Sequence, residues 1–199
     1  MRDVSVVLIG GTSHVGKSTV ARALAQKLGW SCVSTDRLGR HPGRPWTAGG
    51  KPVPAHVVTH YLTLPVEVLT REQLRHYEQM WPVIRSLVER HVDAPGAGRL
   101  VLEGSGVWPD RVAAQQTANV ESVWLTAAPE TLRERIYAAS GYSDLGSTEK
   151  ALVDKFVGRT LRYEEIMMRA VRRLGLNAVD VDAAPSPGAL VEWCLDQWA

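Results

Sequence analysis

The residues with the clearest chemistry lie between positions 11 and 19 of the 199-residue chain. Gly11, Gly16, Lys17 and Ser18 match the pattern G-x-x-x-x-G-K-[ST]. Glycines let the backbone curl so that successive N–H groups point at phosphate oxygens, and the positive end of a following helix dipole strengthens the attraction. This segment predicts a nucleotide-binding loop made by Gly11, Thr12, Ser13, His14, Val15, Gly16, Lys17, Ser18 and Thr19.

Two side chains of this loop have specific expected roles. Lys17 would place a positive charge on the β and γ phosphates, and the Ser18 hydroxyl would ligate magnesium. Thr19 offers the next hydroxyl. We expect His14 to be a spacer, with a ring that is solvated or packs near the nucleotide. The cofactors that these residues predict are ATP and Mg²⁺.

Two carboxylates follow apolar runs and could complete such a site. Asp36 comes after the run from Ser31 to Thr35, where it could take or orient the proton of an acceptor hydroxyl. A helix cap or an Asx-turn is the alternative for Asp36. Glu103 ends the run from 99 to 103 and could hold magnesium or polarise the attacking group. The residue types leave open which acid is the base.

The elements that must position these residues alternate along the chain. Brief apolar runs predict strands at residues 4–9, 31–34, 100–102, 120–125 and 178–181. Amphipathic patterns predict helices at residues 17–28, 70–92, 109–117, 129–139, 148–174 and 187–198. Thr70 and Gln73 form a capping-box pattern, and Pro82 should kink or divide its helix. The alternation predicts one α/β domain with a parallel sheet covered on both faces.

The composition excludes several classes of protein. With 45% hydrophobic and 22% charged residues, the chain is neither disordered nor collagen-like, and no apolar run is long enough to cross a membrane. A net charge of +2 gives no strong field, so we expect no nucleic-acid or membrane partner. We expect a monomer or a homodimer. Cys32 and Cys194 lack any metal or redox spacing, so we expect both to be core residues of a cytoplasmic protein.

Three segments together carry a family resemblance: Gly10-Gly11-Thr-Ser-His-Val-Gly-Lys-Ser-Thr19, Ser34-Thr35-Asp36, and Leu102-Glu103-Gly104 followed by Pro109. The chain resembles P-loop small-molecule kinases, particularly 2-phosphoglycerate kinase-like proteins, and its layout is similar to chloramphenicol phosphotransferase and shikimate kinase. The resemblance implies a P-loop NTPase fold, with a five-stranded parallel sheet and a helical lid over ATP and magnesium. It also implies that the acid after the second strand faces the acceptor. Where 2-phosphoglycerate kinases carry an arginine after the Thr-Asp pair, this chain has Gly39 or Arg40, depending on a one-residue shift.

The segment from residue 37 to 66 is expected to bind the acceptor. It contains basic residues but no acid, and its prolines and glycines predict a loop that can close over a ligand. Arg37, Arg40 and Arg44 could bind a phosphate or carboxylate, although a solvated surface loop is the alternative. His56 and His60 lie one helical turn apart, and without a third metal ligand we expect a surface pair.

Residues 133–162 are expected to form the lid, as two helices joined by a mobile tip at residues 140–146. Four arginines could neutralise charge on the transferred group: Arg133 and Arg135 as catalytic candidates, and Arg159 and Arg162 as further lid candidates. The alternative is a salt-bridged solvated face, because residues 130–173 contain nine basic and seven acidic residues. We expect one or two of the four to be functional.

These features predict an ATP- and magnesium-dependent phosphotransferase that moves the γ-phosphoryl group to a hydroxyl of a small, anionic acceptor resembling 2-phosphoglycerate. The alternatives are an antibiotic, nucleoside or nucleotide kinase of the same fold, or a non-kinase P-loop ATPase. A GTPase-like switch would need an Asn-Lys-x-Asp element, which the sequence lacks. A mechanical ATPase of the AAA type would need a helical subdomain, for which the chain is too short.

Overall fold

A computed structural model describes residues 4–39, 43–46, 52–115, 119–184 and 186–198. Within these residues, parallel strands form a five-stranded sheet in the order β2-β3-β1-β4-β5. The strands are β1 (Val6–Gly11), β2 (Ser31–Ser34), β3 (Leu100–Glu103), β4 (Val120–Thr126) and β5 (Ala178–Asp180). The predicted α/β fold is confirmed, and the strand ends differ from the expected ones by one or two residues at most.

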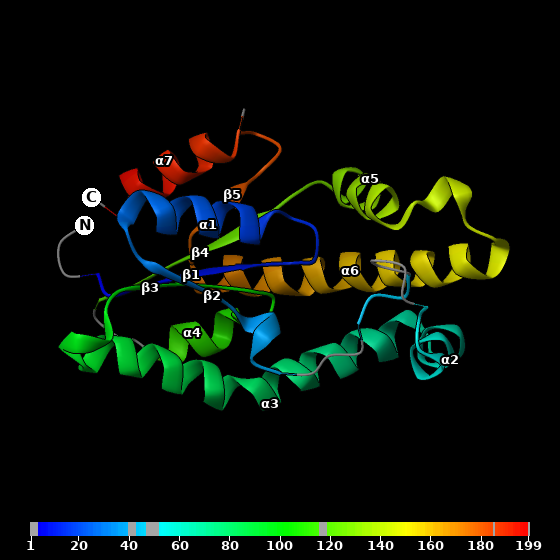
Figure 1. Ribbon diagram of the computed structural model, residues 1–199, viewed down its shortest axis with the longest axis horizontal. Coiled ribbons are helices and arrows are strands. Elements are labelled where there is room, and N and C mark those ends of the chain that lie inside the picture. The colour runs from blue at the N-terminus through cyan, green and yellow to red at the C-terminus, as the bar shows by residue number, and fades with distance from the viewer. Residues whose placement is uncertain (1–3, 40–42, 47–51, 116–118, 185, 199) are drawn as a thin grey trace.

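Helices cover both faces of the sheet (Figure 1). One face carries α1 (Lys17–Leu28) and α7 (Pro187–Gln197), and the other carries α3 (Val66–Asp93), α4 (Pro109–Gln115) and α6 (Ser147–Leu174). Alternate residues of β1 point to opposite layers: Val7 and Ile9 pack toward α1 and α7, whereas Val6 and Leu8 pack toward α3 and α6. Burial on both faces explains why this strand is apolar along its whole length.

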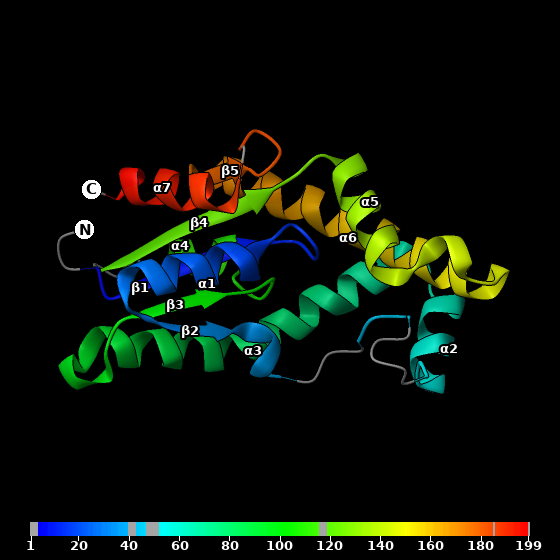
Figure 2. The ribbon, with the colours of Figure 1, turned by 45° about the horizontal axis from the view of Figure 1, so that its top comes forward.

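A third hydrophobic cluster lies beyond the carboxyl edge of the sheet, where α2 (Ala55–Thr63), α5 (Pro129–Ser140) and the first half of α6 meet (Figure 2). It includes Tyr61 of α2, Ile136 of α5 and Phe156 of α6, all nearly inaccessible to solvent. The segment predicted to bind the acceptor and the segment predicted to form the lid therefore share one apolar core. Short 3-10 helices complete the described chain: η1 (Thr35–Arg37), η2 (Pro95–Ala97) and η3 (Tyr142–Asp144).

The segment from 37 to 66 is not all loop, because α2 occupies residues 55–63. Val57 and Tyr61 lie one turn apart on this helix, and both are buried. The expected surface pair of histidines is wrong: His56 is exposed, whereas His60 is half-buried, and its Nδ1 lies 3.6 Å from Glu72 Oε2 of α3.

Two smaller expectations need correction, for Thr70 and for Cys32, and a third is resolved at Pro82. α3 begins at Val66, so Thr70 caps nothing, and its Oγ1 donates instead to the Val66 carbonyl oxygen at 2.8 Å. Of the two outcomes expected at Pro82, division does not occur, because α3 continues to Asp93, and the helix bends along its length (Figure 2). Cys194 is buried as expected, but Cys32 is exposed because β2 is an edge strand. None of the described helices combines the length and the apolarity that crossing a membrane requires.

Candidate active site

The candidate site lies at the carboxyl edge of the sheet. The neighbouring strands β1 and β3 continue into helices on opposite faces, α1 and α4, so the chain diverges where these strands end. A cavity of about 720 Å³ opens at this point. The phosphate-binding loop and α1 line one wall, and side chains of α3 and α6 line another.

The phosphate-binding loop joins β1 to α1. Gly16 precedes α1 with a φ of 106°, no side chain caps the helix, and its first turn holds no acidic residue. The N–H groups at this helix end are therefore left for an anion. Gly11 has a φ of 141°, and a Cβ there would lie 2.8 Å from the Leu125 carbonyl oxygen. Both glycines of the motif thus stand where a side chain would strain the backbone or collide with it.

Lys17 is buried inside the loop, with 8% of its surface exposed. Its Nζ donates to the Thr12 carbonyl oxygen at 2.6 Å. Burial lowers the pKa of Lys17, and the negative charges of Glu103 and Asp36 oppose that shift. A phosphate in the loop would add negative charge beside this ammonium group and favour its protonated form.

Ser18 and Glu103 meet across the site. The Ser18 hydroxyl donates to Glu103 Oε1 at 2.9 Å, and Glu103 is buried at the end of β3 with 4% of its surface exposed. A hydroxyl and a carboxylate are oxygen ligands of the kind that magnesium prefers. Among the described residues, no three His, Cys, Asp or Glu side chains are grouped to hold a metal. An ion here would therefore take its remaining ligands from phosphates and water.

Asp36 lies on η1, directly after β2, and its side chain lines the cavity. The cap of η1 is Ser34, whose Oγ accepts a hydrogen bond from the Asp36 N–H at 3.4 Å, so the alternative reading of Asp36 as a cap does not hold. Gly104 keeps η1 against the end of β3: its φ is 151°, and a Cβ there would lie 1.7 Å from Thr35 Oγ1. This contact sets the distance between the segments that carry Asp36 and Glu103.

His14 packs among aromatic rings rather than in solvent. Its ring lies 5.8 Å from that of Trp46 and 6.0 Å from that of Phe156, and neither ring nitrogen has a hydrogen-bond partner among the described residues. Burial, followed by the charges of Arg44 and Lys17, lowers the pKa of His14 to about 4. The ring is therefore packed at the cavity wall rather than solvated.

The three arginines expected to bind the acceptor differ in position. Arg44 is exposed, lines the cavity and lies over the Trp46 ring, with its Cζ 5.9 Å from the ring centroid. Arg37 is exposed on η1 and is not part of the cavity lining. Arg40 lies outside the described residues. The structure therefore brings one of the two described arginines to the cavity.

The four lid arginines also differ in burial and in position relative to the cavity. Arg159 lines the cavity and is buried, with 7% of its surface exposed. Arg162, one turn further along α6, pairs with Glu165 on the surface. Arg133 and Arg135 belong to α5 and do not line the cavity. Arg162 thus belongs to the salt-bridged face that was the alternative for all four.

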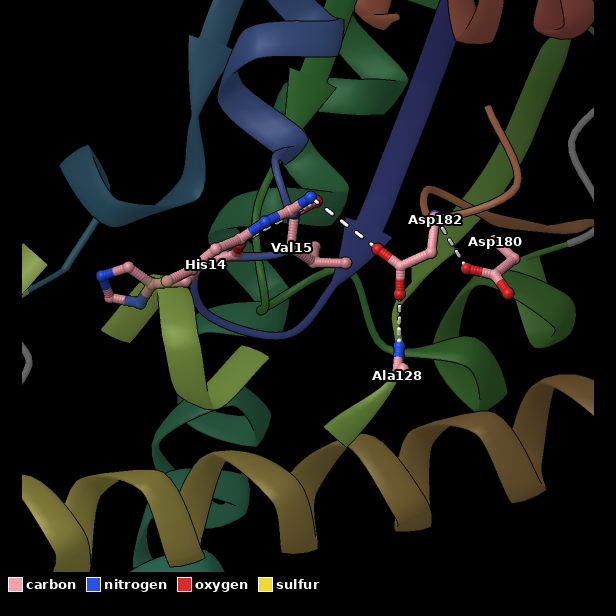
Figure 3. Close-up of polar contacts among 6 residues, drawn as sticks. His14, Val15, Ala128, Asp180 and Asp182 are labelled. Atoms are coloured by element: carbon pink, nitrogen blue, oxygen red, sulfur yellow. Dashed lines mark hydrogen bonds and ion pairs between the residues drawn. The ribbon is translucent and has the colours of Figure 1, made fainter. Parts of the chain in front are cut away.

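Arg135 contacts the backbone of the phosphate-binding loop rather than the cavity. Its Nη1 donates to the Val15 carbonyl oxygen at 3.2 Å, and its Nη2 lies 3.9 Å from Asp182 Oδ1. Figure 3 shows Asp182 beside the loop, where its other carboxylate oxygen accepts the Ala128 N–H at 2.8 Å. Asp180 Oδ1 accepts the Asp182 N–H at 2.9 Å (Figure 3). These bonds join the loop, the start of α5 and the end of β5.

A comparison with protein families gives one match, to the family described as AAA domain, over residues 7–153. The chain belongs to the AAA domain family. The match covers the phosphate-binding loop, Asp36, Glu103 and α5, and it ends within α6, before Arg159. In the described chain only the rest of α6, β5 and α7 follow this AAA domain match. No sequence among the curated proteins matches the chain.

Solved structures share this fold across almost the whole chain. A gluconokinase from Sinorhizobium meliloti is 20% identical, with 98% of this chain and 92% of that chain covered and a TM-score of 0.56. A sugar kinase from a Janibacter species is 18% identical, with coverages of 97% and 93% and a TM-score of 0.57. A shikimate kinase from Aquifex aeolicus is 15% identical, with coverages of 97% and 95% and a TM-score of 0.54. The AAA domain of this chain therefore has the fold of these kinases.

Sequence reasoning missed Glu164, which is buried behind the loop of the AAA domain. Thr126 Oγ1 donates to Glu164 Oε1 at 2.6 Å, while Oε2 has no partner among the described residues. Burial raises the pKa of Glu164 to about 7, against the opposing effects of the Thr126 bond and the Lys17 charge. In the sequence Glu164 is one of two adjacent glutamates on an amphipathic helix, and nothing in that pattern indicates that Glu164 is buried.

Side chains of α3 at the cavity were missed as well. Glu72, Gln73, His76 and Tyr77 all line it. Gln73 Nε2 donates to the Tyr77 hydroxyl at 2.9 Å, and burial raises the pKa of Tyr77. Their spacing of one helical turn was a usable signal, since it places them on one face of the helix.

Proposed function

We propose that the chain is a kinase that transfers the γ-phosphoryl group of ATP to a hydroxyl of a small, anionic acceptor. One observation carries the proposal: Lys17, the Ser18–Glu103 pair and the Asp36 carboxylate face a single cavity that extends beyond the phosphate-binding loop. A second substrate therefore has a place beside the phosphates. The solved structures with this fold include proteins named as a gluconokinase, a sugar kinase and a shikimate kinase.

The residues of the loop bind and orient the nucleotide in this proposal. The uncapped N-terminus of α1 and the loop N–H groups hold the phosphate oxygens, and Lys17 neutralises charge on the β and γ phosphates. Ser18 and Glu103 would hold a magnesium ion, which supplies positive charge to the phosphates when it is bound. Glu103 is thus assigned to the metal.

Asp36 handles the acceptor. Its carboxylate takes the proton of the acceptor hydroxyl as the hydroxyl oxygen forms a bond to the γ-phosphorus. The bond from the γ-phosphorus to the bridging oxygen breaks in the same step, and ADP leaves with that electron pair. Arg44 places a positive charge at the cavity, which favours an anionic acceptor such as the 2-phosphoglycerate-like molecule that the family resemblance suggests. A cytoplasmic location, where ATP is supplied, is part of the same proposal.

Two substitutions test these roles. Lys17→Ala should weaken nucleotide binding and abolish transfer, because the buried ammonium is lost. Asp36→Asn should leave nucleotide affinity unchanged and lower kcat by about 10²- to 10⁴-fold, because the amide cannot accept the proton. Binding is measured by titration with a fluorescent ATP analogue, and transfer by ADP release with a panel of hydroxylated acids, sugars, nucleosides and antibiotics. Asp144→Asn, on exposed η3, is the matched control.

The outcomes separate the proposal from its alternatives. ADP release at one rate with and without every acceptor indicates an ATPase rather than a kinase. Full transfer activity in Asp36→Asn removes Asp36 from the reaction. If Lys17→Ala retains both nucleotide binding and turnover, the assignment of the nucleotide site to this loop is wrong.

A further inference from the structure

Two buried polar atoms at the cavity have no hydrogen-bond partner among the described residues. They are the Nε atom of Arg159 and the Oε1 atom of Gln73, and both residues line the cavity. They come from α6 and α3, so only the tertiary fold brings them to the same region. Buried polar groups are nearly always hydrogen-bonded, because an unpaired one loses its contacts with water and gains nothing in return. Two such atoms at one cavity indicate a ligand that pairs with them.

Arg159 defines the charge of that ligand. Its guanidinium lies between aromatic rings, with Cζ 4.5 Å from the centroid of Phe156 and 5.4 Å from that of Tyr61. Only 7% of Arg159 is exposed, and it forms no ion pair with any carboxylate of the described chain. A buried charge without a counterion is unfavourable. An anion in the cavity would remove this cost.

The charge of Arg159 acts on the α2 and α3 side of the cavity. Burial raises the pKa of Tyr61 and of Tyr77, and the positive charge of Arg159 opposes both shifts. Arg159 also lies over the Tyr61 ring of α2 and shares the cavity lining with Gln73 and Tyr77 of α3. These contacts place the anion that Arg159 requires on the α2 and α3 side of the cavity.

We propose that Arg159 and Gln73 form the acceptor-recognition site and that the acceptor is a hydroxy acid. Its carboxylate pairs with the Arg159 guanidinium, and one of its hydroxyls donates to Gln73 Oε1. The bond from Gln73 Nε2 to the Tyr77 hydroxyl, 2.9 Å long, fixes the amide beside the cavity. This inference rests on the proposed function, because Asp36 is the group that would act on the reacting hydroxyl of the same molecule.

Three pairs of probes test the carboxylate, since the members of each pair differ only at that group. They are D-gluconate and sorbitol, 2-phosphoglycerate and glycerol 2-phosphate, and shikimate and methyl shikimate. Within any pair that is phosphorylated, we expect kcat/KM to be about 10- to 100-fold higher for the carboxylate. The pair of 2-phosphoglycerate and glycerol 2-phosphate, both of which carry a phosphate group, shows separately whether the site also accepts a phosphate.

Substitutions connect this preference to Arg159. Arg159→Met keeps the length and the packing on Phe156, and it should remove the preference mainly through a higher KM for the carboxylate, with KM for ATP unchanged. Arg159→Lys keeps the charge and should restore part of the preference. Gln73→Leu should raise KM for both members of a pair. Arg169→Met is the control, because Arg169 lies exposed on the same helix and pairs with Glu165. Thermal melts show whether each variant folds.

Each result bears on the inference separately from the proposed function. If both members of a pair are phosphorylated with equal kcat/KM, the site does not recognise the carboxylate, although the chain remains a kinase. A raised KM for ATP in Arg159→Met assigns the guanidinium to the nucleotide. If ATP binds and none of the six probes is phosphorylated, the inference that the acceptor is a hydroxy acid is wrong. Loss of the proposed function itself is recognised differently, by failure to bind ATP at all or by ADP release that no acceptor accelerates.

Discussion

The two ends of the cavity are built in different ways. At the phosphate end, the residues from Gly11 to Ser18 are consecutive, and the backbone conformation of the loop sets their positions. At the acceptor end, Gln73 comes from α3 and Arg159 from α6, and the packing of helices sets their positions. A local motif can therefore identify the first end, whereas the second end exists only once the chain has folded. Substitutions should affect the two ends through different physical causes.

The largest effect should come from Gly104→Ala, where the segments that carry Asp36 and Glu103 meet between the two ends. A Cβ at this position would lie 1.7 Å from Thr35 Oγ1, and the φ of 151° is unfavourable for alanine. We expect the free energy of unfolding to fall by about 3 kcal/mol, because η1 must move away from β3. Urea denaturation monitored by tryptophan fluorescence measures the change.

Gly175→Ala is the matched control for this prediction. Gly175 also has a positive φ, 63°, but a Cβ there meets nothing within 4 Å. The backbone strain alone should cost about 1 kcal/mol. Equal losses in the two variants would show that the contact with Thr35 does not hold η1 against β3.

The same contrast explains how far the sequence predicts the site. The loop was predictable because its chemistry depends on neighbouring residues. Asp36 and Glu103 were predictable as cavity residues because the carboxyl ends of parallel strands meet at one edge. Arg159 and Arg162 look alike in the sequence, since both are arginines on one amphipathic helix. Only the packing of α2 against α6 makes one buried and the other exposed.

The elements of the fold also divide into those that the local sequence predicts and those that depend on tertiary packing. The five strands were predictable because each is a short apolar run with a clear boundary. α2 was missed because prolines and glycines are frequent in the residues before it, and only Val57 and Tyr61 of the helix are buried. Tertiary contacts with α6 stabilise a helix for which the local sequence gives little indication.

Glu164 links the phosphate end to α6, and its pKa gives the second prediction. Burial raises the pKa of Glu164 from 4.5 to about 7, so the folded protein holds a proton that the unfolded chain has lost. Stability should therefore fall as the pH rises from about 4.5 to 7, by at most ~1.4 kcal/mol per pH unit from this group. Glu164→Gln keeps an acceptor for Thr126 and cannot ionise, so it should be about 2 kcal/mol more stable than wild type at pH 8.

Urea denaturation of both proteins at a series of pH values measures this difference. His14 contributes with the opposite sign, because its lowered pKa makes its stabilisation disappear as the pH falls from 6.5 to about 4. Subtracting the two curves cancels the His14 contribution and isolates Glu164. Glu165→Gln is the control, since Glu165 is exposed and Arg162 lowers its pKa. Parallel curves for wild type and Glu164→Gln would contradict the burial of an ionisable acid behind the loop.

The smallest effect concerns the turn between α5 and α6, where Tyr142 and Leu145 pack against the same hydrophobic cluster as Phe156. The sequence predicts a mobile tip at residues 140–146, yet the Tyr137 and Tyr142 rings stack at 3.9 Å. Their hydroxyls donate to the two carboxylate oxygens of Asp154 at 2.8 and 3.0 Å. Tyr142→Ala removes the stack and one hydrogen bond on an exposed surface, which should cost about 1 kcal/mol of local stability.

Amide hydrogen exchange at residues 141–146 should therefore accelerate about fivefold in Tyr142→Ala, with the interior of α6 unchanged as the internal reference. Tyr142→Phe keeps the stack and loses only the hydroxyl, so its exchange should lie between those of Tyr142→Ala and wild type. Unchanged exchange in Tyr142→Ala would mean that the stack does not restrain the turn. Acceleration in the expected order would mean that side-chain packing, rather than the glycines at 141 and 146, restrains the turn. Packing between side chains would then set the mobility of this segment even where its sequence most resembles a hinge.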